Sequence, residues 1–105
     1  MVQQISPRDL KARLAAADPP VVLDVREAWE LEIVRLAATV DIPMDKLAAR
    51  IEELPKDRDI VVMCKAGGRS AMAADFLHRR GYRALNLTGG ILGWARDVDP
   101  SLPTY

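Results

Sequence analysis

The chain has 105 residues, of which 50% are hydrophobic and 29% charged, a composition typical of a soluble globular domain. Fifteen basic and fifteen acidic residues give zero net charge, so we expect no attraction to nucleic acid or to an anionic membrane. No apolar run approaches the roughly 20 residues of a membrane span, and the N-terminus lacks a signal-peptide pattern. One cysteine and one histidine exclude an internal disulfide and a four-ligand zinc site. We therefore expect a cytoplasmic protein without metal or other cofactor.

Strand-like and helix-like segments alternate along the chain. Ser6 is a helix N-cap followed by Pro7 at the first helical position, and the apolar run 21–25 is typical of a buried parallel strand. Leu47, Ile51 and Leu54 have helical spacing. In chain order we expect strand 3–5, helix 7–16, strand 21–25, helix 26–33, strand 39–41, a helix from Pro43 to Leu54, strand 60–63, a helix from Arg69 or Ser70 to Arg80, strand 82–87 and helix 91–98.

This alternation predicts an α/β fold with a mainly parallel central sheet of about five strands and helices on both faces. We expect one domain over residues 1–105, with a tail at 98–105. In such sheets ligands bind at the carboxyl ends of strands. Cys64 lies at one such end, and the turn at Asp24 and Arg26 lies at another.

The loop that follows Cys64 has the composition of an anion-binding cradle. Two glycines allow successive backbone N–H groups to turn inward, and the next helix adds its positive dipole end. Lys65 and Arg69 add positive charge, so we expect the thiol to have a pKa in the activated range of roughly 3.5 to 7.5. The predicted site comprises Cys64 as nucleophile and the loop residues Lys65, Ala66, Gly67, Gly68, Arg69 and Ser70.

The alternative is an inert cysteine buried at a strand end, because free cysteine is among the most buried residue types. An inert core cysteine has no need of two glycines and two cations beside it. The sequence therefore favours a reactive thiol.

Four motifs together resemble the rhodanese family of sulfurtransferases, in family order and spacing over nearly the whole chain. They are Asp24-Val25-Arg26-Glu27 with Glu30, Ile42-Pro43, the loop from Cys64 to Arg69 followed by Ser70, and Leu87-Thr88-Gly89-Gly90-Ile91-Leu92-Gly93-Trp94. The stretch from Trp29 to Pro43 and the tail ending Pro103-Thr104-Tyr105 look most like rhodanese domains fused to sulfur-carrier adenylating enzymes.

The resemblance implies a rhodanese-like fold and a persulfide cycle. Cys64 would take the outer sulfur of a small anionic donor such as thiosulfate and pass it to cyanide or a thiol. The loop amides would stabilise the anionic persulfide. The partner would be a sulfur-carrier or desulfurase protein if the chain works as a sulfur relay.

Two of the charged residues near the loop, Arg69 and Arg26, have two interpretations each. Lys65 and Arg69 would bind the donor, although Arg69 could instead tie the loop down through its own hydrogen bonds. Arg26 matches a position that binds anionic donors in some family members; its alternative is an ion pair with Glu27 or Glu30. Asp24 is expected to order the turn as a hydrogen-bond acceptor.

One segment departs from the family pattern. Val34-Arg35-Leu36-Ala37-Ala38-Thr39 stands where the family usually has G-H-I-P-G-A, so both glycines and the histidine are replaced. The backbone there should not rely on a glycine-only conformation. If the segment borders the pocket around Cys64, donor preference or partner docking should differ.

Two other functions remain open. Phosphatases and arsenate reductases of the same fold have one more residue between the cysteine and the arginine, because a tetrahedral oxyanion needs a wider cradle. The loop here has the shorter form. A non-catalytic interaction module is the other alternative, and rhodanese-like domains in that role usually look as if they have lost the cysteine.

Overall fold

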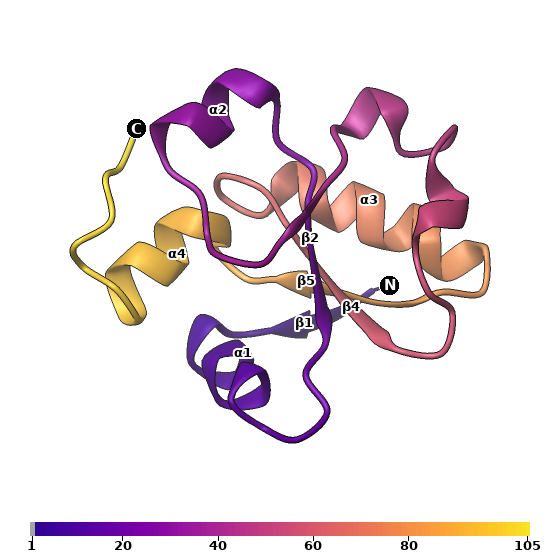
Figure 1. Cartoon of the computed structure of the whole chain (residues 1–105), viewed down its shortest axis with the longest axis horizontal. Helices are drawn as coiled ribbons and strands as arrows, with labels where there is room; N and C mark the ends of the chain where they lie inside the picture. Colours follow the sequence, from indigo (N-terminus) through magenta and orange to yellow (C-terminus); the bar gives the residue numbers. More distant parts are fainter. Residues whose placement is uncertain (1) are drawn as a thin grey trace.

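The computed structural model describes residues 2–105 as an α/β fold in three layers (Figure 1). Within these residues five parallel strands form one sheet in the order β1-β5-β4-β2-β3. The elements are β1 (Gln3–Ile5), α1 (Pro7–Leu14), β2 (Val21–Asp24), α2 (Ala28–Ile33), β3 (Val40–Asp41), the 3-10 helices η1 (Met44–Lys46) and η2 (Ile51–Glu53), β4 (Asp59–Met63), α3 (Gly68–Arg79), β5 (Arg83–Leu87) and α4 (Gly90–Asp97). The predicted α/β fold with a parallel sheet is confirmed. In the described part of the chain no helix is long and apolar enough to cross a membrane.

The core has two halves, one on each face of the sheet. Alternate residues of β4 point to opposite faces, so Ile60 and Val62 join one cluster and Val61 and Met63 join the other. All four side chains are fully buried. The first cluster packs against α3 and the second against α1 and α4, through Ala74 and Leu77 on one face and Leu10 and Ile91 on the other. Helices therefore cover both faces, as predicted.

The prediction of one helix from Pro43 to Leu54 is wrong. Two single-turn 3-10 helices, η1 and η2, occupy this segment, and Arg50 between them has φ −112° and ψ 14°, which interrupts a continuous helix. Leu47 and Leu54 are nonetheless buried, with Ile51 packed against the same cluster. Turns of three residues bring residues spaced by three and four to one side as well. The apolar spacing thus predicted the buried residues correctly but not the type of helix.

Candidate active site

Cys64 directly follows β4 at the carboxyl edge of the sheet. The thiol side chain is buried, and the loop turns back over it so that the Gly67 amide donates to Sγ at 3.1 Å. Gly67 makes this possible because its φ of +109° is a left-handed conformation that other residues rarely adopt. It also caps α3, which begins at Gly68, one or two residues earlier than predicted. The predicted sequence of buried strand, glycine loop and helix is therefore present.

The surroundings of Cys64 act on its thiol in opposite directions. Burial raises the pKa of Cys64, whereas donors that can face the thiolate lower it: the Ser70 hydroxyl when it turns toward the sulfur, and the amides of Ser70, Gly67 and Ala66. The hydrogen bonds outweigh burial, so the pKa lies below its ordinary value. Cys64 also belongs to the buried apolar cluster that packs against α3, so the hydrogen-bond donors are what distinguish it from an inert core cysteine. The geometry is that of an activated thiol.

Gly90 holds the active-site loop from the neighbouring helix. The first amides of α4 bind the loop: Ile91 N–H donates to the Cys64 carbonyl at 2.9 Å, and Leu92 N–H donates to the Lys65 carbonyl at 3.1 Å. A Cβ atom on Gly90 would lie 2.5 Å from both carbonyl oxygens, and its φ is +59°. This position therefore requires glycine. In the sequence, Gly89 and Gly90 belong to a motif that resembles the family, but neither was predicted as a site residue.

Arg69 is tied to the protein by Glu30. Its two terminal nitrogens each donate to a Glu30 carboxylate oxygen at 2.7 Å, a bidentate pair between residues 39 positions apart. These bonds are the main reason that the pKa of Glu30 falls to about 2, and Glu30 in turn raises the pKa of Arg69. The Glu30 side chain is 3% exposed and that of Arg69 38%. These contacts favour the second interpretation of Arg69, in which its hydrogen bonds hold the loop in place.

Arg26 pairs with Asp24, and the predicted ion pair with Glu27 or Glu30 is wrong. The Arg26 guanidinium lies 2.8 Å from the Asp24 carboxylate, and both side chains are fully buried. Asp24 also accepts the Arg26 backbone amide at 3.0 Å and so orders the turn. The remaining guanidinium N–H groups donate to the carbonyls of Val34 and Glu30 and to the Tyr105 hydroxyl. Arg26 thus has no N–H group left over for an anionic donor.

The C-terminal tail reaches the loop through Tyr105, which was not among the predicted site residues. The Tyr105 hydroxyl donates to Glu30 at 2.8 Å and accepts from Arg26 at 3.0 Å. Lys65 Nζ lies 4.5 Å from the centre of the Tyr105 ring, a cation–π contact. Trp29 packs edge-on against the same ring. The resemblance of the tail to the family was the only signal for this residue.

Ser70 and Asn86 complete the surroundings of the sulfur. The Ser70 hydroxyl lies 3.3 Å from Sγ and 2.6 Å from the Asn86 amide oxygen. Both side chains are buried. Ser70 was predicted as part of the loop, whereas Asn86, the fourth of the five residues of β5, had no signal in the sequence beyond being a polar residue in an apolar strand.

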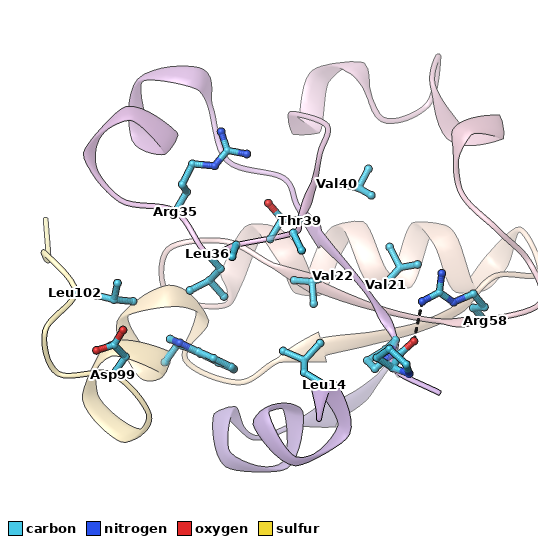
Figure 2. Close-up of a pocket in the computed structure, with 15 residues that line it drawn as sticks. Leu14, Val21, Val22, Arg35, Leu36, Thr39, Val40, Arg58, Asp99 and Leu102 are labelled. Carbon is cyan, nitrogen blue, oxygen red and sulfur yellow. Dashed lines mark hydrogen bonds between the residues drawn. The ribbon is translucent and has the colours of Figure 1, made fainter. Parts of the chain in front are cut away.

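Most of the segment that departs from the family pattern lines a cavity that does not include the Cys64 loop. The cavity has a volume of about 680 Å³, and no residue from 64 to 70 lines it. Figure 2 shows it between Leu14, Val22 and Leu102, with Arg35 and Thr39 at its wall. Residues 35–39 thus line this cavity, while the Val34 carbonyl accepts a hydrogen bond from Arg26. Ala38 has φ +59°, so a left-handed conformation is kept here without glycine, contrary to the expectation. Arg35 forms an ion pair with Asp41.

A buried thiol at the carboxyl edge of a parallel sheet, with backbone amides directed at its sulfur, defines an α/β protein with a cysteine-centred loop. Within residues 2–105 no three His, Cys, Asp or Glu side chains are grouped so as to hold a metal ion. The family profile described as a rhodanese-like domain matches residues 6–97, and the chain belongs to this family.

Its relatives extend over nearly the whole chain. A protein of Allochromatium vinosum named sulfurtransferase is 39% identical over 101 residues, which are 95% of this chain and 94% of that protein. The Zea mays adenylyltransferase and sulfurtransferase MOCS3-1 is 31% identical over 110 residues, 97% of this chain but 24% of that longer protein. A rhodanese-related protein of Thermoplasma volcanium has a crystal structure similar at TM-score 0.83 and 33% identity, covering 96% of this chain and 95% of that one. The predicted resemblance to the family is confirmed.

Proposed function

We propose that this chain is a sulfurtransferase that carries a sulfane sulfur on Cys64 as a persulfide. The observation that carries the proposal is the hydrogen-bonded thiol: Sγ accepts the Gly67 amide at 3.1 Å at the N-terminal end of α3. Donors that stabilise a thiolate also stabilise the anionic persulfide formed from it. The family membership and the name of the Allochromatium vinosum relative support sulfur transfer.

The proposed cycle has two steps. The Cys64 thiolate attacks the outer sulfur of thiosulfate, the sulfur–sulfur bond of the donor breaks, and sulfite leaves with the bonding electron pair. Cys64 now bears a persulfide anion within the loop of residues 65–70. A nucleophilic acceptor, such as cyanide or a thiol, then attacks the terminal sulfur, and the Cys64 thiolate is released for the next cycle.

The cations of the site contribute unequally to this proposal. Arg26 is fully buried and its N–H groups are bound within the protein, so it orders the turn rather than binding the donor. Arg69 and Lys65 keep part of their surface open to solvent and add positive charge beside the loop. We expect a small anionic donor to be attracted by these two residues and to be held mainly by the loop amides.

The test is the intact mass of the protein after incubation with thiosulfate, with Cys64→Ala as the matched control. We expect a gain of one sulfur atom on the native chain only, and its loss as thiocyanate when cyanide is added. A second incubation with a cysteine desulfurase and cysteine tests a protein donor. If neither incubation loads sulfur onto Cys64, the proposal is wrong and a non-catalytic interaction module is favoured. Turnover of a phosphate ester that disappears in Cys64→Ser would instead indicate a phosphatase.

Sulfur relay to a partner protein is a second candidate. The Zea mays relative is named as both an adenylyltransferase and a sulfurtransferase, which favours a sulfur-carrier partner. Met72, one turn into the helix that follows the loop, is 69% exposed and offers an apolar contact for such a partner. Loading from the desulfurase but not from thiosulfate would favour the relay.

We further infer a cytoplasmic setting and one domain over residues 1–105. A reducing compartment keeps the single cysteine as a thiol, which the proposed cycle requires. The contacts of Tyr105 with Glu30 and Arg26 support the tail as part of that domain.

A further inference from the structure

Three buried polar side chains from three different elements meet beneath the active-site loop. Cys64 follows β4, Ser70 lies in the first turn of α3, and Asn86 belongs to β5. Their exposed fractions are 1%, 0% and 4%. Ser70 Oγ lies 3.3 Å from Cys64 Sγ and 2.6 Å from Asn86 Oδ1. Water has little access to these groups, so their hydrogen bonds depend on one another.

The orientation of the Asn86 amide is fixed by a backbone carbonyl. Asn86 Nδ2 lies 3.3 Å from the Gly67 carbonyl oxygen and 2.9 Å from Gln4 Oε1. A carbonyl oxygen only accepts hydrogen bonds, so the amide nitrogen must face Gly67 and the amide oxygen must face Ser70.

This orientation fixes the position of the Ser70 hydroxyl proton. A serine hydroxyl has one proton, and the Asn86 amide oxygen has none. At 2.6 Å the hydroxyl therefore donates to Asn86. The 3.3 Å contact between Ser70 Oγ and Cys64 Sγ is then made by the thiol proton, with the hydroxyl oxygen as acceptor.

We propose that Asn86 is a positioning residue for Cys64: it draws the Ser70 hydroxyl proton away from the sulfur and so favours the thiol form of the resting site. When Cys64 loses its proton to solvent, Ser70 can donate to the thiolate only by turning away from Asn86. The Asn86 amide oxygen then loses its buried partner, and this loss opposes the stabilisation of the thiolate. The inference rests on the proposed role of Cys64 as the nucleophile.

A limit on the stabilisation of the Cys64 thiolate would keep the sulfur nucleophilic. A thiolate becomes less nucleophilic as its stabilisation increases, and the best attacking thiol titrates close to the ambient pH. The Gly67 amide and the N-terminal end of α3 stabilise the thiolate, whereas Asn86 limits the additional contribution of Ser70. The sulfur would then stay both ionisable and reactive near neutral pH.

The test is a pH titration of the Cys64 thiolate by its ultraviolet absorbance, with Cys64→Ala as the blank. Asn86→Leu keeps nearly the same shape but removes the acceptor, so Ser70 becomes free to donate to the sulfur. We expect the titration midpoint to fall by about half to one pH unit, the effect of one hydrogen bond. In a Ser70→Ala background the same substitution should leave the midpoint unchanged.

Asn86→Asp is the matched control, because it keeps an acceptor oxygen toward Ser70 and should not lower the midpoint. An unchanged or higher midpoint in folded Asn86→Leu would overturn the proposal. So would an equal fall in the Ser70→Ala background, because Asn86 would then act through the loop and not through Ser70. No sulfur donor is present in these titrations, so their outcome is independent of whether Cys64 loads sulfur.

A measurement on the unmodified chain keeps the proposal testable if Asn86→Leu does not fold. The protein has one cysteine, so its Raman spectrum contains a single S–H stretching band. Below the titration midpoint we expect this band at the lowered frequency of a hydrogen-bond donor, and at a higher frequency in Ser70→Ala. A band at the free-thiol frequency in the native protein would refute the assigned direction of the hydrogen bonds.

Discussion

Removing the charge of Glu30 should destabilise the protein in a way that depends on pH. Glu30→Gln keeps the size of the side chain but breaks the ion pair with Arg69. The pKa of Glu30 is about 2 in the folded protein against an ordinary 4.5, a difference of about 2.5 units, or roughly 3 kcal/mol at about 1.4 kcal/mol per unit. Because the Arg69 side chain is 38% exposed, solvent screening reduces the expected loss to about 2 kcal/mol.

The lowered pKa of Glu30 determines the direction in which the stability changes with pH. The carboxylate contributes its full stabilisation above pH 4.5, and this contribution is lost as the pH falls toward 2. Urea unfolding of native protein and Glu30→Gln, at several pH values between 7 and 2, measures the difference in the free energy of unfolding. We expect that difference to shrink toward zero across the acidic range. A difference that stayed constant from pH 7 to pH 2 would refute the reasoning. Glu53→Gln, which removes an exposed pair with Arg50, is the matched control and should show a much smaller effect.

Three further substitutions test the supports of the site and the strained segment. Gly90→Ala should cost about 1–3 kcal/mol and slow sulfur loading, because its methyl group would lie 2.5 Å from the Cys64 and Lys65 carbonyls. Gly68→Ala, with no atom within 4 Å of the added carbon, should lose less stability in the same urea assay, and equal losses would contradict the close contact. Arg26→Met should cost about 3–5 kcal/mol because it leaves the fully buried Asp24 without its partner, and adding Asp24→Asn should restore part of the loss. Ala38→Gly should raise stability by up to about 1 kcal/mol and the melting temperature by roughly 4–8 °C, since φ is +59°; an unchanged or lower melting temperature would argue against strain at this position.

Local features of the fold were predictable from the sequence. The Ser6 side-chain oxygen accepts the Asp9 amide at 3.1 Å, as a serine before Pro7 at a helix start predicts. The buried strand before Cys64 and the glycine loop after it were likewise evident, because burial and left-handed turns leave signals within a few residues. The segment from Pro43 to Leu54 shows the limit: apolar spacing predicts which side chains are buried, but two types of helix satisfy it.

The sequence by itself therefore determined the parallel α/β fold and the position of the thiol at the carboxyl end of a strand. Only the tertiary structure decided the partners of that thiol and of the charges around it. Arg69 and Glu30 are 39 residues apart, and Tyr105 and Glu30 are 75 apart. Ser70 and Asn86 come from different elements. No regular sequence pattern predicts ion pairs and buried hydrogen bonds of this kind, because they form where separate strands and helices meet at one edge of the sheet.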